Sequence, residues 1–419
     1  MKHIFYILFT AVVCLNACAQ TTSVPYANEV DSLINSAVRE SKIPGAVLCV
    51  VVGDKVQYMQ AYGYRQVYPD TLPMTISTQF DLASLSKIVG TGMSLMTLVD
   101  KGLINIDDPI TKYLPEYTHY KDETIGDDRD QTVLDFLTHT SGLPAYASYT
   151  ELLKDEPLAS PARRKELLLR YMATCKRRAP AGTDVNYSCL NFISLQYLIE
   201  RVTGQRLDDF ASKNVFKPLK MKNTCYYPLG SSPKPHTIIA PTEKIAPYDP
   251  SAKVPSIIWT GYKDIQYFNR KRTIKNNPCY EALVHDPLAR EINAGVSGNA
   301  GVFSTAEDLS RMAIWMLNPE EKKGPMRSST LRMMMQVPEG YEAFGRALSW
   351  DQSSDYAGCK GSKTSSRVVC HTGYTGTSMV VDPEKKVAVI LLTNRAHPSD
   401  GGGVAAVRRA VADAIFGCY

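Results

Sequence analysis

The sequence predicts an α+β fold, an α/β sandwich in which an antiparallel sheet built from both chain ends is flanked by helices and carries an inserted all-helical domain. Strand patterns lie near both ends of the 419-residue chain, a helical pattern accompanies each set, and the middle is rich in helices. With 44% hydrophobic residues, the chain can bury a sizeable core. A formal charge of +5, dispersed along the chain, gives no reason to expect nucleic acid as a partner.

The first elements of the predicted sheet follow a short polar spacer. Residues 27–42 repeat apolar side chains at helical spacing, which predicts an amphipathic helix. Residues 45–53 and 56–63 read as two strands, and Gly53-Asp54 between them is a hairpin turn signal.

The other end of the chain supplies the remaining strands. Residues 366–370, 377–382 and 387–393 are three strand-like segments separated by turn residues, and 404–416 reads as a closing helix. Strands at both ends with a helix-rich middle predict one antiparallel sheet closed by both termini.

The middle of the chain differs in composition from the two ends. Pro-, Gly- and Ser-rich loops there separate four helical stretches, at residues 132–139, 162–174, 190–202 and 207–216. We therefore expect an α/β domain of residues 27–104 and 288–419 and an inserted helical domain of residues 105–287, which together form a single catalytic unit.

The extreme N-terminus, residues 1–19, is predicted to be a signal peptide. Lys2 and His3 precede an apolar run at 4–15 that is too short to span a bilayer. Residues 15–18 (LNAC) resemble a bacterial lipobox, in which Cys18 becomes lipidated, whereas 17–19 (ACA) also fit ordinary signal peptidase. Both interpretations predict export, and we favour the first. It predicts a protein of the periplasm or outer envelope of a Gram-negative bacterium, anchored to the membrane through Cys18.

Two of the ten cysteines belong to the signal-peptide region. The remaining eight show neither CxxC nor Cys/His ligand spacing, so we expect no metal site. Most are interpreted as small buried hydrophobic residues. A disulfide between Cys359 and Cys370 is an alternative that an oxidising compartment permits.

The sharpest local signal is residues 80–87 (FDLASLSK), at the start of a predicted helix that runs to about Lys101. Ser84 and Lys87 are three residues apart and share one face of the helix. A serine hydroxyl needs a base, and a lysine serves as that base only if its pKa is lowered, so we expect burial to leave this amine uncharged. Ser86 lies away from that face and is interpreted as a packing or capping residue.

Two further segments follow in order: residues 186–192 (NYSCLNF), which begin a helix, and residues 370–377 (CHTGYTGT), on a predicted strand. With Ser84 and Lys87 they resemble the serine β-lactamase and penicillin-binding-protein superfamily, specifically its class C-like branch of β-lactamase-related hydrolases and esterases. Four more stretches resemble segments of that branch: 103–114 (LINIDDPITKYL), 134–144 (LDFLTHTSGLP), 298–309 (GNAGVFSTAEDL) and 377–394.

The resemblance implies a β-lactamase/transpeptidase-like fold and assigns roles within it. Ser84 would be the acylated nucleophile, Lys87 its proton acceptor and Tyr187 the residue that relays protons to the leaving group and later to water. The backbone N–H groups of Ser84 and Tyr374 would form the oxyanion hole.

The strand that lines the cleft would carry His371, Thr372 and Gly373, where Lys-Thr-Gly is more common in the family. A histidine there keeps a donor near Tyr187 but loses a permanent charge, so capture of a substrate carboxylate should weaken.

A second departure replaces the asparagine of the family's Tyr-x-Asn motif by Cys189. That asparagine normally orients the lysine and binds the substrate amide, and a thiol is a poor hydrogen-bonding substitute. An unmade bond costs about 1–3 kcal/mol, so weak or no antibiotic turnover is expected.

Other polar residues invite simpler interpretations. His139 is read as a satisfied buried histidine rather than a catalytic base, and His285 as a loop residue at the cleft entrance rather than a metal ligand. His397 is read as a strand-end cap. Cys189 is not expected to be a nucleophile, because no adjacent histidine would activate it.

The sequence thus predicts a serine hydrolase that acts through an acyl-enzyme on an ester or amide, with a peptidoglycan peptide or a small acyl compound as substrate. We expect no cofactor and a monomer. A penicillin-binding or sensor protein that hardly deacylates, and a non-catalytic binding protein of the same fold, remain as alternatives.

Overall fold

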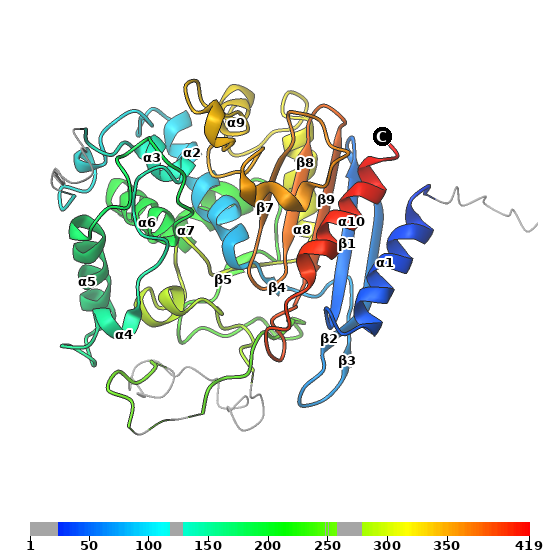
Figure 1. Cartoon of the computed structure of the whole chain (residues 1–419), viewed down its shortest axis with the longest axis horizontal. Coiled ribbons are helices and arrows are strands. Elements are labelled where there is room, and N and C mark those ends of the chain that lie inside the picture. Colours follow the sequence, from blue (N-terminus) through cyan, green and yellow to red (C-terminus); the bar gives the residue numbers. More distant parts are fainter. Residues whose placement is uncertain (1–23, 118–128, 248, 250, 258–278) are drawn as a thin grey trace, which may run out of the picture.

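The computed structural model describes residues 24–117, 129–247, 249, 251–257 and 279–419. The signal-peptide prediction, with Cys18, lies outside these residues. A six-stranded antiparallel sheet forms one half of the molecule, with the strand order β3-β2-β1-β9-β8-β7, and helices fill the other half (Figure 1). Its strands are β1 (Gly45–Val52), β2 (Lys55–Gln66), β3 (Leu72–Pro73), β7 (Val369–Thr372), β8 (Ser378–Asp382) and β9 (Val387–Thr393).

The two ends of the chain meet in the centre of this sheet. Strand β1 pairs with β2 on one side and with β9 on the other, in a register that places Leu48 opposite Leu391. The predicted fold class is therefore confirmed.

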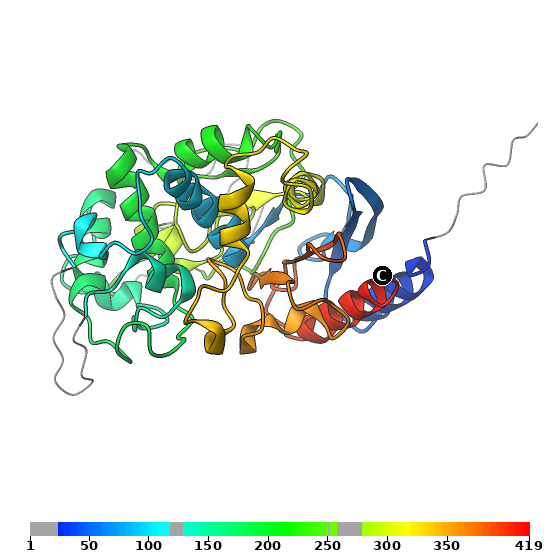
Figure 2. The ribbon, with the colours of Figure 1, turned by 90° about the horizontal axis from the view of Figure 1, so that it is seen from above.

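Helices cover both faces of the sheet. Helices α1 (Ala27–Arg39) and α10 (Val404–Phe416) lie together on one face, and α8 (Ala306–Leu317) covers the other (Figures 1 and 2). Every residue of β1 from Gly45 to Val51 is buried, because alternate side chains enter opposite cores. Leu48 packs towards α1 and α10, whereas Cys49 packs towards α8.

The other half of the molecule consists mainly of helices. The α-helices are α2 (Met93–Asp100), α3 (Val133–Thr138), α4 (Tyr149–Leu152), α5 (Pro161–Thr174), α6 (Cys189–Thr203), α7 (Leu207–Ala211) and α9 (Ser328–Met334). Short 3₁₀ or π elements accompany them: η1 (Ala83–Leu85), η2 (Lys87–Gly92), η3 (Ile110–Lys112), η4 (Ser212–Phe216), η5 (Leu288–Ile292), η6 (Glu342–Phe344) and η7 (Asp355–Lys360).

The prediction of an all-helical middle region needs one addition. A second sheet has the order β4-β6-β5, built from β4 (Phe80–Asp81), β6 (Val302–Ser304) and β5 (Cys225–Tyr226). Strand β5 lies within residues 105–287. Two residues are too few to produce an alternating pattern, so no periodicity in the sequence marks this strand.

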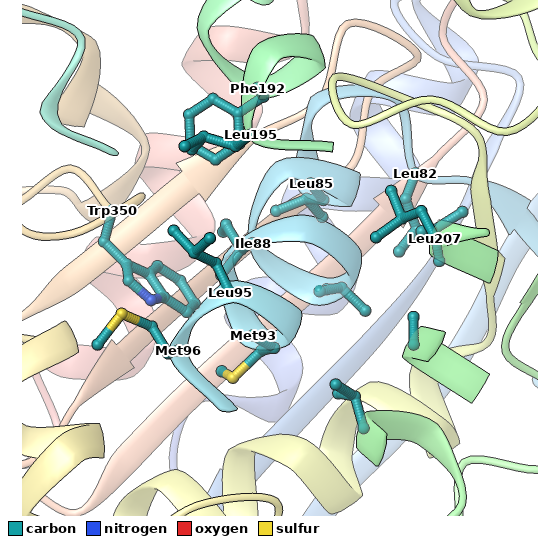
Figure 3. Packing of buried hydrophobic residues seen from close by; sticks show 14 of the residues in the cluster. Leu82, Leu85, Ile88, Met93, Leu95, Met96, Phe192, Leu195, Leu207 and Trp350 are labelled. Atoms are coloured by element: carbon teal, nitrogen blue, oxygen red, sulfur yellow. The ribbon is translucent and has the colours of Figure 1, made fainter. Parts of the chain in front are cut away.

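The predicted helix after Ser84 is broken into three parts. It begins as a 3₁₀ turn (η1), continues as a π-helix (η2) and becomes α-helical only in α2. Apolar side chains surround it, as expected of a helix at the centre of a core. Figure 3 shows this packing, with side chains of α6 and α7 and the indole of Trp350 around the helix.

Among the described residues, no helix combines the length and the apolar character needed to cross a membrane.

Gly298 is a position where only glycine fits. A Cβ there would lie 1.9 Å from the carbonyl oxygen of Phe192. Its N–H donates to Gln196 Oε1 at 2.8 Å, and its carbonyl accepts from Thr91 Oγ1 at 2.8 Å, so the backbone is held on both sides.

Gly298→Ala should therefore lower the free energy of unfolding by about 1–3 kcal/mol through overpacking. Gly401→Ala is the matched control, because a Cβ at Gly401 meets no atom within 4 Å. Chemical denaturation of both variants measures the difference, and equal stabilities would contradict the packing described here.

Candidate active site

The nucleophile candidate follows a strained turn. Ala83 has a φ of 46°, in the left-handed region that non-glycine residues rarely adopt. The carboxylate of the buried Asp81 holds this turn, because its Oδ1 accepts from the Ala83 N–H at 2.9 Å. Ser84 comes next, in the first turn of η1, where backbone N–H groups have no partner within the helix. Ser86 points elsewhere and accepts from the Val302 N–H at 2.9 Å, as its interpretation as a packing residue required.

Lys87 is completely buried and its amine contacts three acceptors. Its Nζ lies 3.0 Å from Ser84 Oγ, 3.1 Å from the backbone carbonyl of Asn299 and 3.5 Å from Cys189 Sγ. The sequence predicted the contact with Ser84 and placed Cys189 among the substrate-binding residues, as a poor hydrogen-bonding substitute for the family's asparagine. Asn299 was not singled out, although it belongs to residues 298–309, one of the stretches that resemble the family.

The direction in which the pKa of Lys87 is shifted differs from the sequence prediction. Burial by itself lowers the pKa of Lys87, but negative charge on Cys189 or Tyr187, when ionised, raises it by more, and the net direction is upward. Three acceptor partners also suit an ammonium, which has three N–H donors. Desolvation alone therefore does not make this amine a free base. Burial raises the pKa of Tyr187, while the charge of Lys87 opposes that rise, so the two groups share their protons as a pair.

Tyr187 lies against this pair from the start of α6. Its ring centroid is 5.0 Å from Lys87 Nζ, and its hydroxyl interacts with both Ser84 and Lys87. On the other side, the ring of His139 lies 4.5 Å from that of Tyr187. His139 Nδ1 accepts from the Ser188 N–H at 3.0 Å, which fixes the chain next to Tyr187.

The expectation for His139 is thus half right. It is buried, but its Nε2 has no partner among the described residues. Burial, followed by the charge of Arg346, lowers the pKa of His139 well below its usual range, so the ring is neutral.

The turn between β7 and β8 is attached to the chain just before the nucleophile. Thr375 Oγ1 donates to the carbonyl of Asp81 at 2.7 Å, and Thr377 Oγ1 donates to that of Leu82 at 2.9 Å. A Cβ at Gly373 would lie 2.3 Å from the same Leu82 carbonyl, so glycine permits this close approach. The Tyr374 N–H donates to no backbone carbonyl among the described residues, as an oxyanion donor requires.

His371 lies on β7 beside Tyr187, with ring centroids 5.9 Å apart. Its Nδ1 is 2.8 Å from the carbonyl of Thr372, which can only accept, so Nδ1 carries the proton. Burial is the main cause that lowers the pKa of His371 to about 4, so at neutral pH Nε2 is an acceptor. The sequence prediction of a donor near Tyr187 is wrong for this reason, because the single N–H is used by Thr372, the next residue.

His285, which the sequence analysis placed at the cleft entrance, lies next to Tyr374 on the turn after β7. The ring of His285 stacks on the half-exposed ring of Tyr374 at 5.4 Å, and its backbone N–H donates to Asp81 Oδ2 at 2.8 Å. Its Nε2 is 2.9 Å from Glu243 Oε2. Arg395 Nε donates to the Tyr374 carbonyl at 2.7 Å and so fixes the turn that presents the Tyr374 N–H.

Two other sequence interpretations have a structural outcome. His397 follows β9 and joins two segments, since its Nε2 accepts from the Val67 N–H at 3.0 Å and its Nδ1 lies 2.9 Å from the Thr242 carbonyl. The eight described cysteines are free thiols, including Cys359 and Cys370, so the alternative of a disulfide between these two is not observed. No group of three His, Cys, Asp or Glu side chains suited to a metal ion occurs in the part of the chain that the structure describes.

A serine–lysine–tyrosine arrangement with a buried lysine, next to a His-Thr-Gly at the end of β7 and on a sheet closed by both chain ends, defines a serine hydrolase of the β-lactamase and penicillin-binding-protein superfamily. Comparison with known families gives the narrower assignment. The family described as Beta-lactamase matches residues 30–414, so the chain belongs to that family.

Similar proteins include several hydrolases. The chain is 29% identical over 396 residues to the N-acetylmuramyl-L-alanine amidase of Bacillus subtilis (strain 168), covering 91% of this chain and 84% of that protein. It is 26% identical over 378 residues to a putative D-alanyl-D-alanine carboxypeptidase of Escherichia coli (strain K12), covering 88% and 82%. The solved structure of EstCE1, a hydrolase with promiscuous acyltransferase activity, has a TM-score of 0.69 at 22% identity, covering 94% of this chain and 98% of that chain, which shows the shared fold.

His371 gives a pH dependence of stability. Its pKa is about 4 in the folded chain, against 6.5 for an unperturbed imidazole, so the unfolded chain binds more protons between these values. Stability is complete above about pH 6.5 and falls as the pH drops towards 4, by about 1.4 kcal/mol per pH unit for one such group. His371→Gln should remove this share of the slope.

Urea denaturation at several pH values between 4 and 8 measures the slope of stability against pH. His236→Gln, at an exposed imidazole, is the matched control and should keep the slope of the unchanged chain. An unchanged slope in His371→Gln would contradict the neutral, buried imidazole.

Proposed function

We propose that this chain hydrolyses an amide or ester of a peptidoglycan fragment through an acyl-enzyme on Ser84. The observation that carries the proposal is the contact of Ser84 Oγ with Lys87 Nζ at 3.0 Å, beside Tyr187 and the turn that presents the Tyr374 N–H. The cell-wall activities named for the amidase and carboxypeptidase relatives support the substrate class.

In the acylation step, Ser84 Oγ attacks the scissile carbonyl and its proton passes to the Lys87–Tyr187 pair, which for this step must hold one proton fewer than an ammonium and a phenol together. The backbone N–H groups of Ser84 and Tyr374 receive the oxyanion of the tetrahedral intermediate. Tyr187 then returns a proton to the leaving amine or alcohol, and the acyl group stays on Ser84.

In the deacylation step, a water molecule attacks the acyl carbonyl and gives its proton to the same pair. Ser84 recovers its proton and the acid is released. The reaction needs no group beyond the chain and water, because the net change is the addition of one water across the amide or ester bond.

Within the substrate class, we favour the amide between N-acetylmuramic acid and L-alanine. The neutral His371 offers no permanent charge for the terminal carboxylate of a D-alanyl-D-alanine peptide. The relative named N-acetylmuramyl-L-alanine amidase supports this amide, in which the scissile carbonyl belongs to the sugar acid and the leaving group is the peptide amine.

We also propose that residues 1–19 direct export and that Cys18 anchors the mature chain in the envelope of a Gram-negative bacterium, where it acts as a monomer. The apolar run at 4–15 and the residues LNAC support this location.

Incubation with N-acetylmuramyl-L-alanyl-D-isoglutamine tests the proposal. The chain should release N-acetylmuramic acid and the dipeptide, measured by mass spectrometry, and Ser84→Ala should lower the rate by about 10³-fold or more. Ser86→Ala is the matched control and should retain activity, since Ser86 Oγ binds only backbone.

If neither this amide, phenyl esters nor D-alanyl-D-alanine peptides are cleaved, the hydrolase proposal fails. A stoichiometric burst of product without turnover would instead indicate the penicillin-binding or sensor alternative.

Cys189 explains the expected weak turnover of antibiotics. Cys189→Asn restores an amide that can bind the substrate amide and Lys87, a gain of about 1–3 kcal/mol. Nitrocefin hydrolysis should therefore rise about tenfold or more in kcat/KM. Cys418→Asn makes the same chemical change at an exposed thiol and should have no effect. Equal nitrocefin rates in both variants would contradict this role of Cys189.

A further inference from the structure

Tyr187 is enclosed by titratable and charged groups from several elements. Its ring centroid lies 5.2 Å from that of Tyr356 on η7 and 5.8 Å from the guanidinium carbon of Arg346. The groups that face the Ser84–Lys87–Tyr187 cluster, or act on its charges, are Cys189, His139, His371, Tyr356, Arg346 and, through its effect on the charges of Lys87 and Cys189, Asp286.

Of these groups, Arg346 is a buried cation that no catalytic step above uses. Its side chain is fully buried and one nitrogen, Nη1, forms an ion pair with Asp351. Its other two nitrogens, Nε and Nη2, have no partner among the described residues. A buried guanidinium with two unpartnered nitrogens keeps much of its charge unscreened, because it is shielded from water.

Arg346 is also fixed in place by the strand that carries His371. Asp351 exchanges two backbone hydrogen bonds with Cys370, at 2.8 and 2.9 Å, and Cys370 precedes His371 on β7. The ion pair therefore couples the position of the guanidinium to β7, while the guanidinium faces the ring of Tyr187 within the range of a cation–π interaction.

His371 does not bring a permanent positive charge to the phenol of Tyr187. A lysine at the first position of the Lys-Thr-Gly motif would bring a permanent positive charge to the phenol, and a neutral imidazole with an acceptor at Nε2 does not.

We infer that Arg346 is a positioning residue that supplies, from behind the ring of Tyr187, the second positive charge that His371 does not provide. This charge favours the anionic form of the phenol whenever the Lys87–Tyr187 pair takes up or gives back a proton. The inference rests on the proposed function, since it concerns the proton transfers of the acyl-enzyme reaction.

The test compares a variant that removes the guanidinium together with its partner carboxylate, so that no lone buried carboxylate remains and the net charge of the pair stays zero, with a variant that keeps the cation. Arg346→Met combined with Asp351→Asn removes both charges, whereas Arg346→Lys keeps a cation without the planar fork. The readouts are kcat, KM and the pH dependence of kcat/KM with a phenyl ester, after circular dichroism has shown that each variant is folded.

A positive charge lowers the pKa of a nearby acid, so its removal raises the pKa of the pair. The double variant should lose about tenfold or more in kcat with little change in KM, and the acidic limb of its pH profile should move up by about one pH unit. In Arg346→Lys the acidic limb of the pH profile should stay where it is in the unchanged chain. Adding His371→Lys to the double variant should restore both kcat and the original position of the acidic limb of the pH profile.

The inference would be overturned if the acidic limb of the pH profile did not move in the folded double variant. It would also be overturned if this limb moved equally far in Arg346→Lys. Either result means that the guanidinium acts by packing alone. If the double variant does not fold, Arg346→Gln combined with Asp351→Asn, which keeps a donor and an acceptor in place of the ion pair, is used with the same two outcomes. Failure of the proposed function is distinct, because the unchanged chain would then cleave no ester at all.

Discussion

A buried lysine amine must find hydrogen-bond acceptors, and the position of Lys87 depends on three, two of which come from distant parts of the chain. Ser84 lies one turn before it, Cys189 begins α6, and the Asn299 carbonyl precedes β6. No carboxylate forms an ion pair with this amine in the part of the chain that the structure describes. The segment of Ser84 and Lys87, the start of α6 and the segment before β6 must therefore be folded against one another before Lys87 has all three acceptors.

Two residues at the site differ from the family pattern, His371 and Cys189. His371 is neutral and presents an acceptor, so it attracts a carboxylate less than a lysine would. Cys189 replaces an amide by a thiol whose pKa is raised by burial, so it stays uncharged and binds weakly. Ser84, Lys87 and Tyr187, the residues that we propose transfer protons, match the family pattern.

The sequence predicts the fold well because its strands are long apolar runs and its motifs stand in order. Residues 45–53 and 387–393 are found as β1 and β9, side by side in the sheet. Contacts between residues that are distant in the sequence produce no pattern from which they could be predicted. The charge of Lys87 depends on Cys189 and Tyr187, the N–H of His371 is consumed by a backbone carbonyl, and Arg346 reaches Tyr187 from a loop without any motif. Strand β5 is too short to have a period.

The most direct measurement of the central claim is the site and rate of covalent labelling by a fluorophosphonate, mapped by mass spectrometry of the digested chain. The account predicts a single adduct on the peptide that contains Ser84, formed rapidly in the unchanged chain and lost in Lys87→Met. An adduct on another residue, or labelling of Ser84 at the same rate without the lysine amine, would contradict it.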